Sequence, residues 1–392
     1  MSKTSNIVIC KNRVVIEGED VGQFESFTVT SRRQTLGATA TLTLPLYAIG
    51  LDNPFTSQSS TTSRGRATRR VRSKTVFANI KVSAKVDVYC WYESPQFGEK
   101  LRVFDEVHVF SGFIEHIAEG FPTKFYLRDG SFVLRFGEAK GWDENATLSK
   151  ILNDCINIAV PAFNEERKAK GLPPISGLTY KADYKGLQAE TSPLGFTNFA
   201  AGRAPFEVVQ YLMQSLYMYG GVDNDFNLFF GYRSTDTTSP ILKLDTQHNV
   251  ISRDIVPVDS RFVDYDVKVT TTINGKKYTA TGGLKTSKTA DQKSAFDKKT
   301  GEPVRVYATG LKTQKEVQDF ADRLLNSIKG DRNKGSLTLL LYPKVELLDS
   351  IRFDDTVFDI YDAQYYVAGY TFSANSQGYY QKLEIVDKVF AL

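Results

Sequence analysis

The sequence predicts an α+β protein that is mostly β, with two β-barrel modules flanking a mixed helical and stranded middle region. Alternating apolar and polar residues fill the first and last thirds, while the middle third carries apolar residues at helical spacing. Phe and Tyr, which favour strands, occur 26 and 20 times, against 3 Met and 2 Trp. Since 392 residues exceed one ordinary core, we expect three domains, over residues 1–138, 139–256 and 257–392.

The first third reads as a series of short strands. Alternation is clearest over residues 39–44, where Ala40, Leu42 and Leu44 are separated by threonines. Further strands are predicted over residues 6–10, 13–16, 24–31, 79–92 and 106–117. A hairpin is predicted between residues 124–128 and 132–136, turned by Asp129-Gly130. Strands joined by short turns are typical of a sandwich or barrel.

A long basic segment, residues 54–76, interrupts this module. Residues 56–63 are almost all Ser and Thr, and the next eleven include six basic side chains: Arg64, Arg66, Arg69, Arg70, Arg72 and Lys74. We interpret the segment as a mobile loop that projects from the barrel. Three roles stay open for it: a solvated loop, contact with a neighbouring protein, or contact with nucleic-acid phosphates. No aromatic residue falls among the six basic ones, so base stacking is not supported.

The middle third has helical periodicity. Leu148, Ile151, Leu152, Cys155 and other apolar residues share one face of a helix that we expect to be capped near residue 145 and stopped at residue 161, a proline. A short charged helix is expected over residues 164–170. Another helix opens at residue 205, a proline at the first helical position, and runs to residue 219. A hairpin with its turn at residues 223–225 follows.

The last third returns to strands around one well-marked helix. Strands over residues 263–271 and 277–280 flank Asn274-Gly275, a strong hairpin signal. Thr313 and Glu316 form a capping box for a helix over residues 313–329. Strands are then predicted over residues 336–342, 350–353, 365–372 and 380–386. A β module that carries one packed helix is a coherent unit.

Composition excludes several classes of protein. The formal charge of +4 is too small to indicate nucleic-acid binding by the whole chain. Cys10, Cys90 and Cys155 have no close partner in the sequence and are interpreted as small buried apolar side chains, which predicts synthesis in a reducing cytoplasm. The polar start of the chain is unlike a signal peptide, and no apolar run approaches the roughly 20 residues of a membrane helix, so no membrane anchoring is expected.

Histidines offer little for catalysis or metal binding. His108 and His116 lie eight residues apart in one predicted strand, a span of roughly 26 Å at about 3.3 Å per residue, which is too far for a shared metal. With His248, we interpret them as surface or interface residues. The sequence lacks the common hydrolase, zinc-helix and phosphate-loop motifs.

Two acidic clusters have alternative interpretations. Asp223, Asp225 and Asn227 superficially resemble a calcium loop, but the Gly and the distal Glu of such a loop are missing, so we favour a hairpin turn. A second cluster is interpreted as an exposed turn, with paired carboxylates for glycan cleavage as the alternative: Asp349, Asp354, Asp355 and Asp359. We therefore expect no catalytic, cofactor-binding or metal-binding residues and no enzyme activity.

The order of these elements resembles the baseplate hub family of contractile phage tails. This family includes the late-control-protein-D-like hubs and the phage Mu hub, and is related to the first part of type VI secretion spike proteins. The similarity lies in residues 109–114 (VFSGFI), 204–209 (APFEVV), 219–230 (YGGVDNDFNLFF) and 307–310 (YATG) followed by the helix over 313–329. Each motif is loose, and their order is what carries the resemblance.

The resemblance implies an assembly role. Members of the family form homotrimers in which each subunit supplies two tail-tube-like barrels, and the ring adapts the sixfold tail tube to the threefold central spike. It implies the tube and spike proteins as partners, with tape-measure protein or DNA passing through the lumen. The location implied is the virion tail baseplate, assembled in the bacterial cytoplasm. The long basic loop departs from the family pattern. A receptor- or glycan-binding tail protein, and a hexameric distal tail protein of a non-contractile phage, stay as alternatives.

Overall fold

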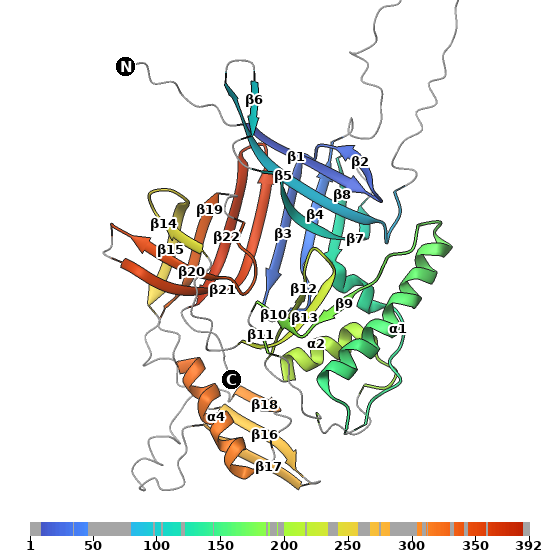
Figure 1. Cartoon of the computed structure of the whole chain (residues 1–392), viewed down its shortest axis with the longest axis vertical. Coiled ribbons are helices and arrows are strands. Elements are labelled where there is room, and N and C mark those ends of the chain that lie inside the picture. The colour runs from blue at the N-terminus through green and yellow to red at the C-terminus, as the bar shows by residue number, and fades with distance from the viewer. Residues whose placement is uncertain are drawn as a thin grey trace, which may run out of the picture.

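The computed structural model confirms a protein that is mostly β with few helices (Figure 1). It describes residues 9–33, 35–45, 80–96, 99–102, 105–118, 122–143, 145–185, 187–188, 194, 200–215, 218–233, 242–257, 267–273, 276–282, 304–307, 311, 313–329, 333–340, 344–357 and 360–386. Two curved groups of strands lie side by side, and the helical middle region lies beside the first of them.

The first β module is formed by eight strands around one apolar core. They are β1 (Ile9–Ile16), β2 (Glu19–Gly22), β3 (Ser26–Arg32), β4 (Thr39–Leu44), β5 (Lys85–Gln96), β6 (Glu99–Arg102), β7 (Val107–Ala118) and β8 (Thr123–Asp129). As predicted, β4 alternates, with Ala40 and Leu42 buried in this core. The basic loop of residues 54–76 lies outside the described residues.

The second β module is formed by six strands. They are β14 (Leu242–Asp245), β15 (Val250–Pro257), β19 (Asn333–Leu340), β20 (Ser350–Asp355), β21 (Ile360–Asn375) and β22 (Gly378–Val386). One buried cluster takes apolar side chains from all six: Leu244, Val250, Leu337, Ile351, Tyr365 and Leu383 among them. The sheet therefore curves around its own core.

The two modules share a single 14-stranded sheet, because β21 pairs with β3. The antiparallel register runs from Gly369 opposite Arg32 to Ala374 opposite Phe27. Beyond this point the β21–β22 hairpin leaves its own module, and its side chains pack into the first core. The Phe372 ring lies 6.2 Å from that of Phe27.

Neither module closes into a barrel through the strands described. The sheet path ends at β15 on one side and β2 on the other, and β14 and β15, although consecutive, are not paired with each other. The closed barrels expected from the sequence are therefore not formed by these pairings.

The middle region packs two helices and a five-stranded sheet against the first module. Its helices are α1 (Leu148–Ala169) and α2 (Pro205–Ser215), and its strands are β9 (Thr179–Lys181), β10 (Asp183–Tyr184), β11 (Leu187–Gln188), β12 (Tyr219–Val222) and β13 (Asn227–Arg233). The expectation of a stop at residue 161 was wrong, because α1 continues through Pro161 and absorbs the segment expected to form a separate helix. Phe163 and Arg167 are buried on the continuing face, and this packing outweighs one lost backbone hydrogen bond.

The hairpin predicted after β8 was also wrong. Residues Gly130–Arg135 form the 3₁₀ helix η3 instead. The Asp129 carboxylate accepts the Ser131 N–H at 3.0 Å and so caps its start. Phe132, Val133 and Leu134 are all buried, which a strand with one face in solvent cannot achieve.

A separate unit combines α4 (Gln314–Lys329) with a three-stranded sheet of β16 (Val267–Ile273), β17 (Lys276–Thr281) and β18 (Val304–Tyr307). The predicted helix is confirmed, and the Thr313 hydroxyl accepts the Glu316 N–H at 3.2 Å, as in a capping box. The predicted pairing of β16 with β17 is confirmed too, although residues 274–275 are outside the described set. No helix among the described residues is long and apolar enough to span a membrane.

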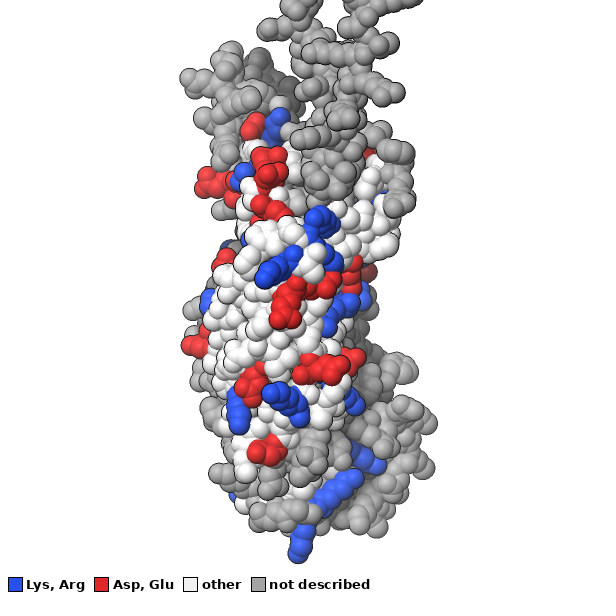
Figure 2. Space-filling view, turned by 90° about the vertical axis from the view of Figure 1, so that its right-hand side faces the viewer, with Lys and Arg blue, Asp and Glu red and all other residues white. Residues whose placement is uncertain are grey.

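Charges on the surface are mixed. On the face shown in Figure 2, acidic and basic side chains lie next to one another, and uncharged side chains cover most of the middle. Acidic side chains gather toward the upper end, which holds β1 and β2 in Figure 1. This face carries no large basic patch.

The shared sheet predicts that a truncation in β21 destabilises the first module. Phe372→Ala removes a side chain that is 4% exposed, and we expect a loss of about 3–5 kcal/mol in the free energy of unfolding, measured by urea denaturation. Tyr361→Ala, on the same strand but 64% exposed, is the matched control and should change it by less than about 0.5 kcal/mol. Equal losses for the two variants would contradict the shared core.

Candidate functional site: the junction of three regions

The turn between β12 and β13 is the part of the middle region that reaches the first module. Within the turn, the Asp223 carboxylate accepts the N–H groups of Asp225 and Asn227 at 3.0 and 2.8 Å. Phe226 has a φ of +61°, a left-handed conformation that suits a tight turn. The hairpin-turn interpretation of this acidic cluster is therefore confirmed, and Asp223 is occupied by its own turn.

Asn224 joins this turn to β7. Its side-chain nitrogen donates to the His108 carbonyl at 3.0 Å, and its side-chain oxygen accepts the Ser111 N–H at 3.2 Å. An amide that both donates to and accepts from one strand sets the position of the turn on that strand.

Behind this contact lies a polar group of the first module. The Ser111 hydroxyl donates to Asp87 at 2.5 Å, and His108 Nε2 lies 3.2 Å from the same carboxylate. The His108 ring also stacks on Tyr89, with 4.6 Å between ring centres. Burial acts to raise the pKa of Asp87, but the hydrogen bonds from His108 and Ser111 outweigh it, and the pKa lies below its ordinary value.

The segment before β20 brings the second module to the same place. Lys344 donates to the His108 carbonyl at 2.8 Å and lies 2.8 Å from the Glu346 carboxylate. From the middle region, Lys185 lies 2.7 Å from Glu346 and 2.9 Å from Asp349. Glu346 is therefore held between one lysine that contacts the first module and another that belongs to the middle region.

Electrostatics keep Glu346 ionised. Burial acts to raise the pKa of its carboxyl, but attraction to Lys344 and Lys185 outweighs burial and lowers the pKa to about 2. Lys185 sits at a φ of +48°, in the turn between β10 and β11, which places its amine between two carboxylates. These contacts join three segments that are far apart in the chain.

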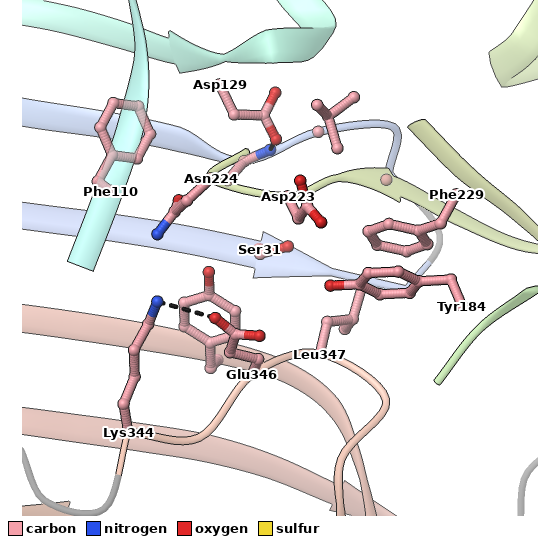
Figure 3. Close-up of a pocket in the computed structure, with 15 residues that line it drawn as sticks. Ser31, Phe110, Asp129, Tyr184, Asp223, Asn224, Phe229, Lys344, Glu346 and Leu347 are labelled. Carbon is pink, nitrogen blue, oxygen red and sulfur yellow. Dashed lines mark hydrogen bonds and ion pairs between the residues drawn. The ribbon is translucent and has the colours of Figure 1, made fainter. Parts of the chain in front are cut away.

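A small cavity of about 40 Å³ lies at the meeting point (Figure 3). Ser31 and Asp129 line it from the first module, Tyr184 and Asp223 from the middle region, and Glu346 from the second module. Burial raises the pKa of the Asp129 carboxyl to about 6. The cavity has room for only a few water molecules, far less than the several hundred Å³ of a typical ligand pocket. The arrangement suits a joint between regions better than a substrate site.

The second acidic cluster is divided among separate cations. Asp349 pairs with Lys185, Asp354 lies 3.0 Å from Lys243, and Asp355 forms an ion pair with Arg253. The exposed-turn interpretation was wrong for Asp349 and Asp355, which are 5% and 1% exposed. Asp359 lies outside the described residues. Each described carboxylate of this cluster has its own basic partner.

The remaining candidates are scattered. His116 lies against Tyr126, and His248 lies 2.8 Å from Asp245. No group of three potential metal ligands occurs among the residues that the structure describes. Cys90 and Cys155 are buried as predicted, whereas Cys10 is half-buried. The six basic loop residues lie outside the described residues: Arg64, Arg66, Arg69, Arg70, Arg72 and Lys74.

Sequence reasoning did not find the junction residues Lys185, Lys344 and Glu346. Each stands in a polar segment between strands, where a charged side chain is expected to be solvated. Only their long-range contacts distinguish them, and no local motif carries that information.

Solved structures place this architecture among phage tail proteins. A tail protein from Neisseria meningitidis MC58 matches with a TM-score of 0.56 and 12% identity, covering 96% of each chain. A 43 kDa tail protein of prophage MuSo2 from Shewanella oneidensis matches with a TM-score of 0.53 and 12% identity, covering 97% of this chain and 100% of that one. No protein-family model and no curated protein matches the sequence. The chain therefore has the fold of these tail proteins over nearly its whole length, as the resemblance of its motifs predicted.

The position of Glu346 predicts a pH-dependent contribution to stability. Because its folded-state pKa lies below its ordinary value of 4.5, this contribution is present above pH 4.5 and is lost as the pH falls toward about 2. Glu346→Gln should lower the free energy of unfolding at pH 7 by about 1 kcal/mol, a modest value because the side chain is 38% exposed. Urea denaturation at several pH values should show the gap to wild type narrowing below pH 4.5.

Glu384→Gln, which removes the partner of the exposed Arg32, is the matched control and should cost less than about 0.5 kcal/mol. A loss for Glu346→Gln that is no larger than this, or that does not change with pH, would contradict a linking role for Glu346.

Proposed function

We propose that this chain is a structural subunit of a phage-type tail, and that three copies form the baseplate hub. In this role the ring adapts a sixfold tail tube to a threefold central spike of a contractile tail. The single observation that supports the proposal best is the likeness to two phage tail proteins over nearly the full length of all three chains.

The junction is consistent with a load-bearing subunit. A shared sheet and a buried polar junction join the first module, the middle region and the second module, so that force on one of them reaches the others. The proposed partners are the tail tube protein, the central spike protein and, in the lumen, tape-measure protein or DNA. The proposed location is the tail baseplate of the virion, assembled in the host cytoplasm. The proposed role requires no catalytic step.

Closed barrels belong to the same proposal. The end strands β2 and β15 have one neighbour each among the described strands, and unpaired edges are normally covered. Neighbouring subunits in a ring provide such cover.

The mass of the purified protein in solution tests this function. Across a concentration series, light scattering and native mass spectrometry should find a species of three times 43.9 kDa. Six copies would contradict the hub and favour a distal tail protein. A monomer at every concentration that binds host-cell glycans would favour a receptor-binding tail protein instead.

A further inference from the structure

The outer face of six adjoining strands is rich in hydroxyl groups. In the order β22-β21-β3-β4-β8-β7, these strands carry outward Ser and Thr in cross-strand rows, which we call the threonine face: Thr28, Thr30, Thr39, Thr41, Thr371 and Ser373. One row continues from Thr41 to Tyr126, which is 44% exposed, and another from Thr371 to Lys382. The face crosses the seam between the two β modules.

This face carries an excess of positive charge. Its two glutamates are matched, Glu384 by Arg32 at 2.9 Å and Glu115 by Arg128 at 3.2 Å. Lys124 and Lys382 are exposed, and neither has a carboxylate within ion-pair distance among the described residues. Four basic side chains against two acidic ones leave a formal charge of +2.

The opposite sign gathers at the end of the first module that holds β1, β2 and the start of β7. Six carboxylates stand there, which we call the acidic end: Glu19, Asp20, Glu25, Glu93, Asp105 and Glu106. Only two basic side chains stand among them. Arg13 lies 2.7 Å from Glu106 and 4.0 Å from Asp20, and Lys11 is the other. The formal charge of this end is −4, and Figure 2 shows acidic side chains gathering there.

We infer that the acidic end of one copy docks on the threonine face of a second copy. The inference rests on the proposed trimeric ring and supplies its subunit contact. The two surfaces are complementary in charge to each other, whereas each would repel a copy of itself. A contact between two different surfaces is head-to-tail, and such a contact closes into a ring when its rotation allows. The unmatched Lys124 and Lys382 then meet carboxylates that lack a basic partner in their own subunit.

Charge reversal tests this contact. The variant Lys124→Glu/Lys382→Glu changes only the threonine face, and Glu19→Lys/Asp20→Lys changes only the acidic end. All four residues are exposed, so the fold should persist, which circular dichroism and the thermal midpoint check. Native mass spectrometry over a dilution series should show that each double variant needs about tenfold more protein than wild type to assemble. High salt should weaken wild-type assembly in the same direction.

Combining all four substitutions exchanges the signs of the two surfaces and should restore assembly. Lys140→Glu/Lys168→Glu, at exposed lysines of the middle region, is the matched control and should assemble like wild type. A wild-type trimer that neither double variant weakens would overturn the inference and leave the proposed function standing. Dissociation that the fourfold variant does not reverse would also overturn it. A wild-type monomer at every concentration would contradict both.

Discussion

The pairing of β21 with β3 is the interaction on which the rest of the structure depends. Along this seam, residues 369–374 of the second module lie beside residues 27–32 of the first, and the backbone hydrogen bonds of two modules become one ladder. Because the β21–β22 hairpin extends past its own core, Phe372 and Tyr379 complete the core of the first module. A chain built in this way behaves as one body, and the relative orientation of its modules is set by a sheet and not by a linker.

The polar junction adds a second constraint at one side of this seam. Asn224 positions the middle region on β7, while Glu346 is held between Lys344 and Lys185. Hydrogen bonds and ion pairs are directional, so they define one arrangement where apolar packing alone would tolerate several. For a subunit that transmits force between a tube and a spike, such a single arrangement is the physical requirement. The cavity at the junction is too small to suggest a ligand.

Local patterns predicted much of the fold, and long-range contacts explain what they missed. Alternation identified residues 39–44, and Thr313 with Glu316 identified the start of α4. Pro161 was misread because burial of Phe163 and Arg167 outweighs one lost hydrogen bond, and Asp129 was misread because its carboxylate caps η3. The pairing of β14 with β20 and of β15 with β19 joins segments about a hundred residues apart, which no local signal reveals. The junction residues were missed for the same reason, since Lys185 and Glu346 look like ordinary surface charges.

Hydrogen exchange measured by mass spectrometry tests the shared sheet most directly. If the two modules form one body, the amides of residues 27–32 and 369–374 exchange in the slowest class, together with the cores of both modules and only through global unfolding. Exchange of β4, β5 and β8 as one unit, while β20, β21 and β22 stay protected, would contradict this account. It would mean that the first module opens independently and that the seam does not hold the subunit together.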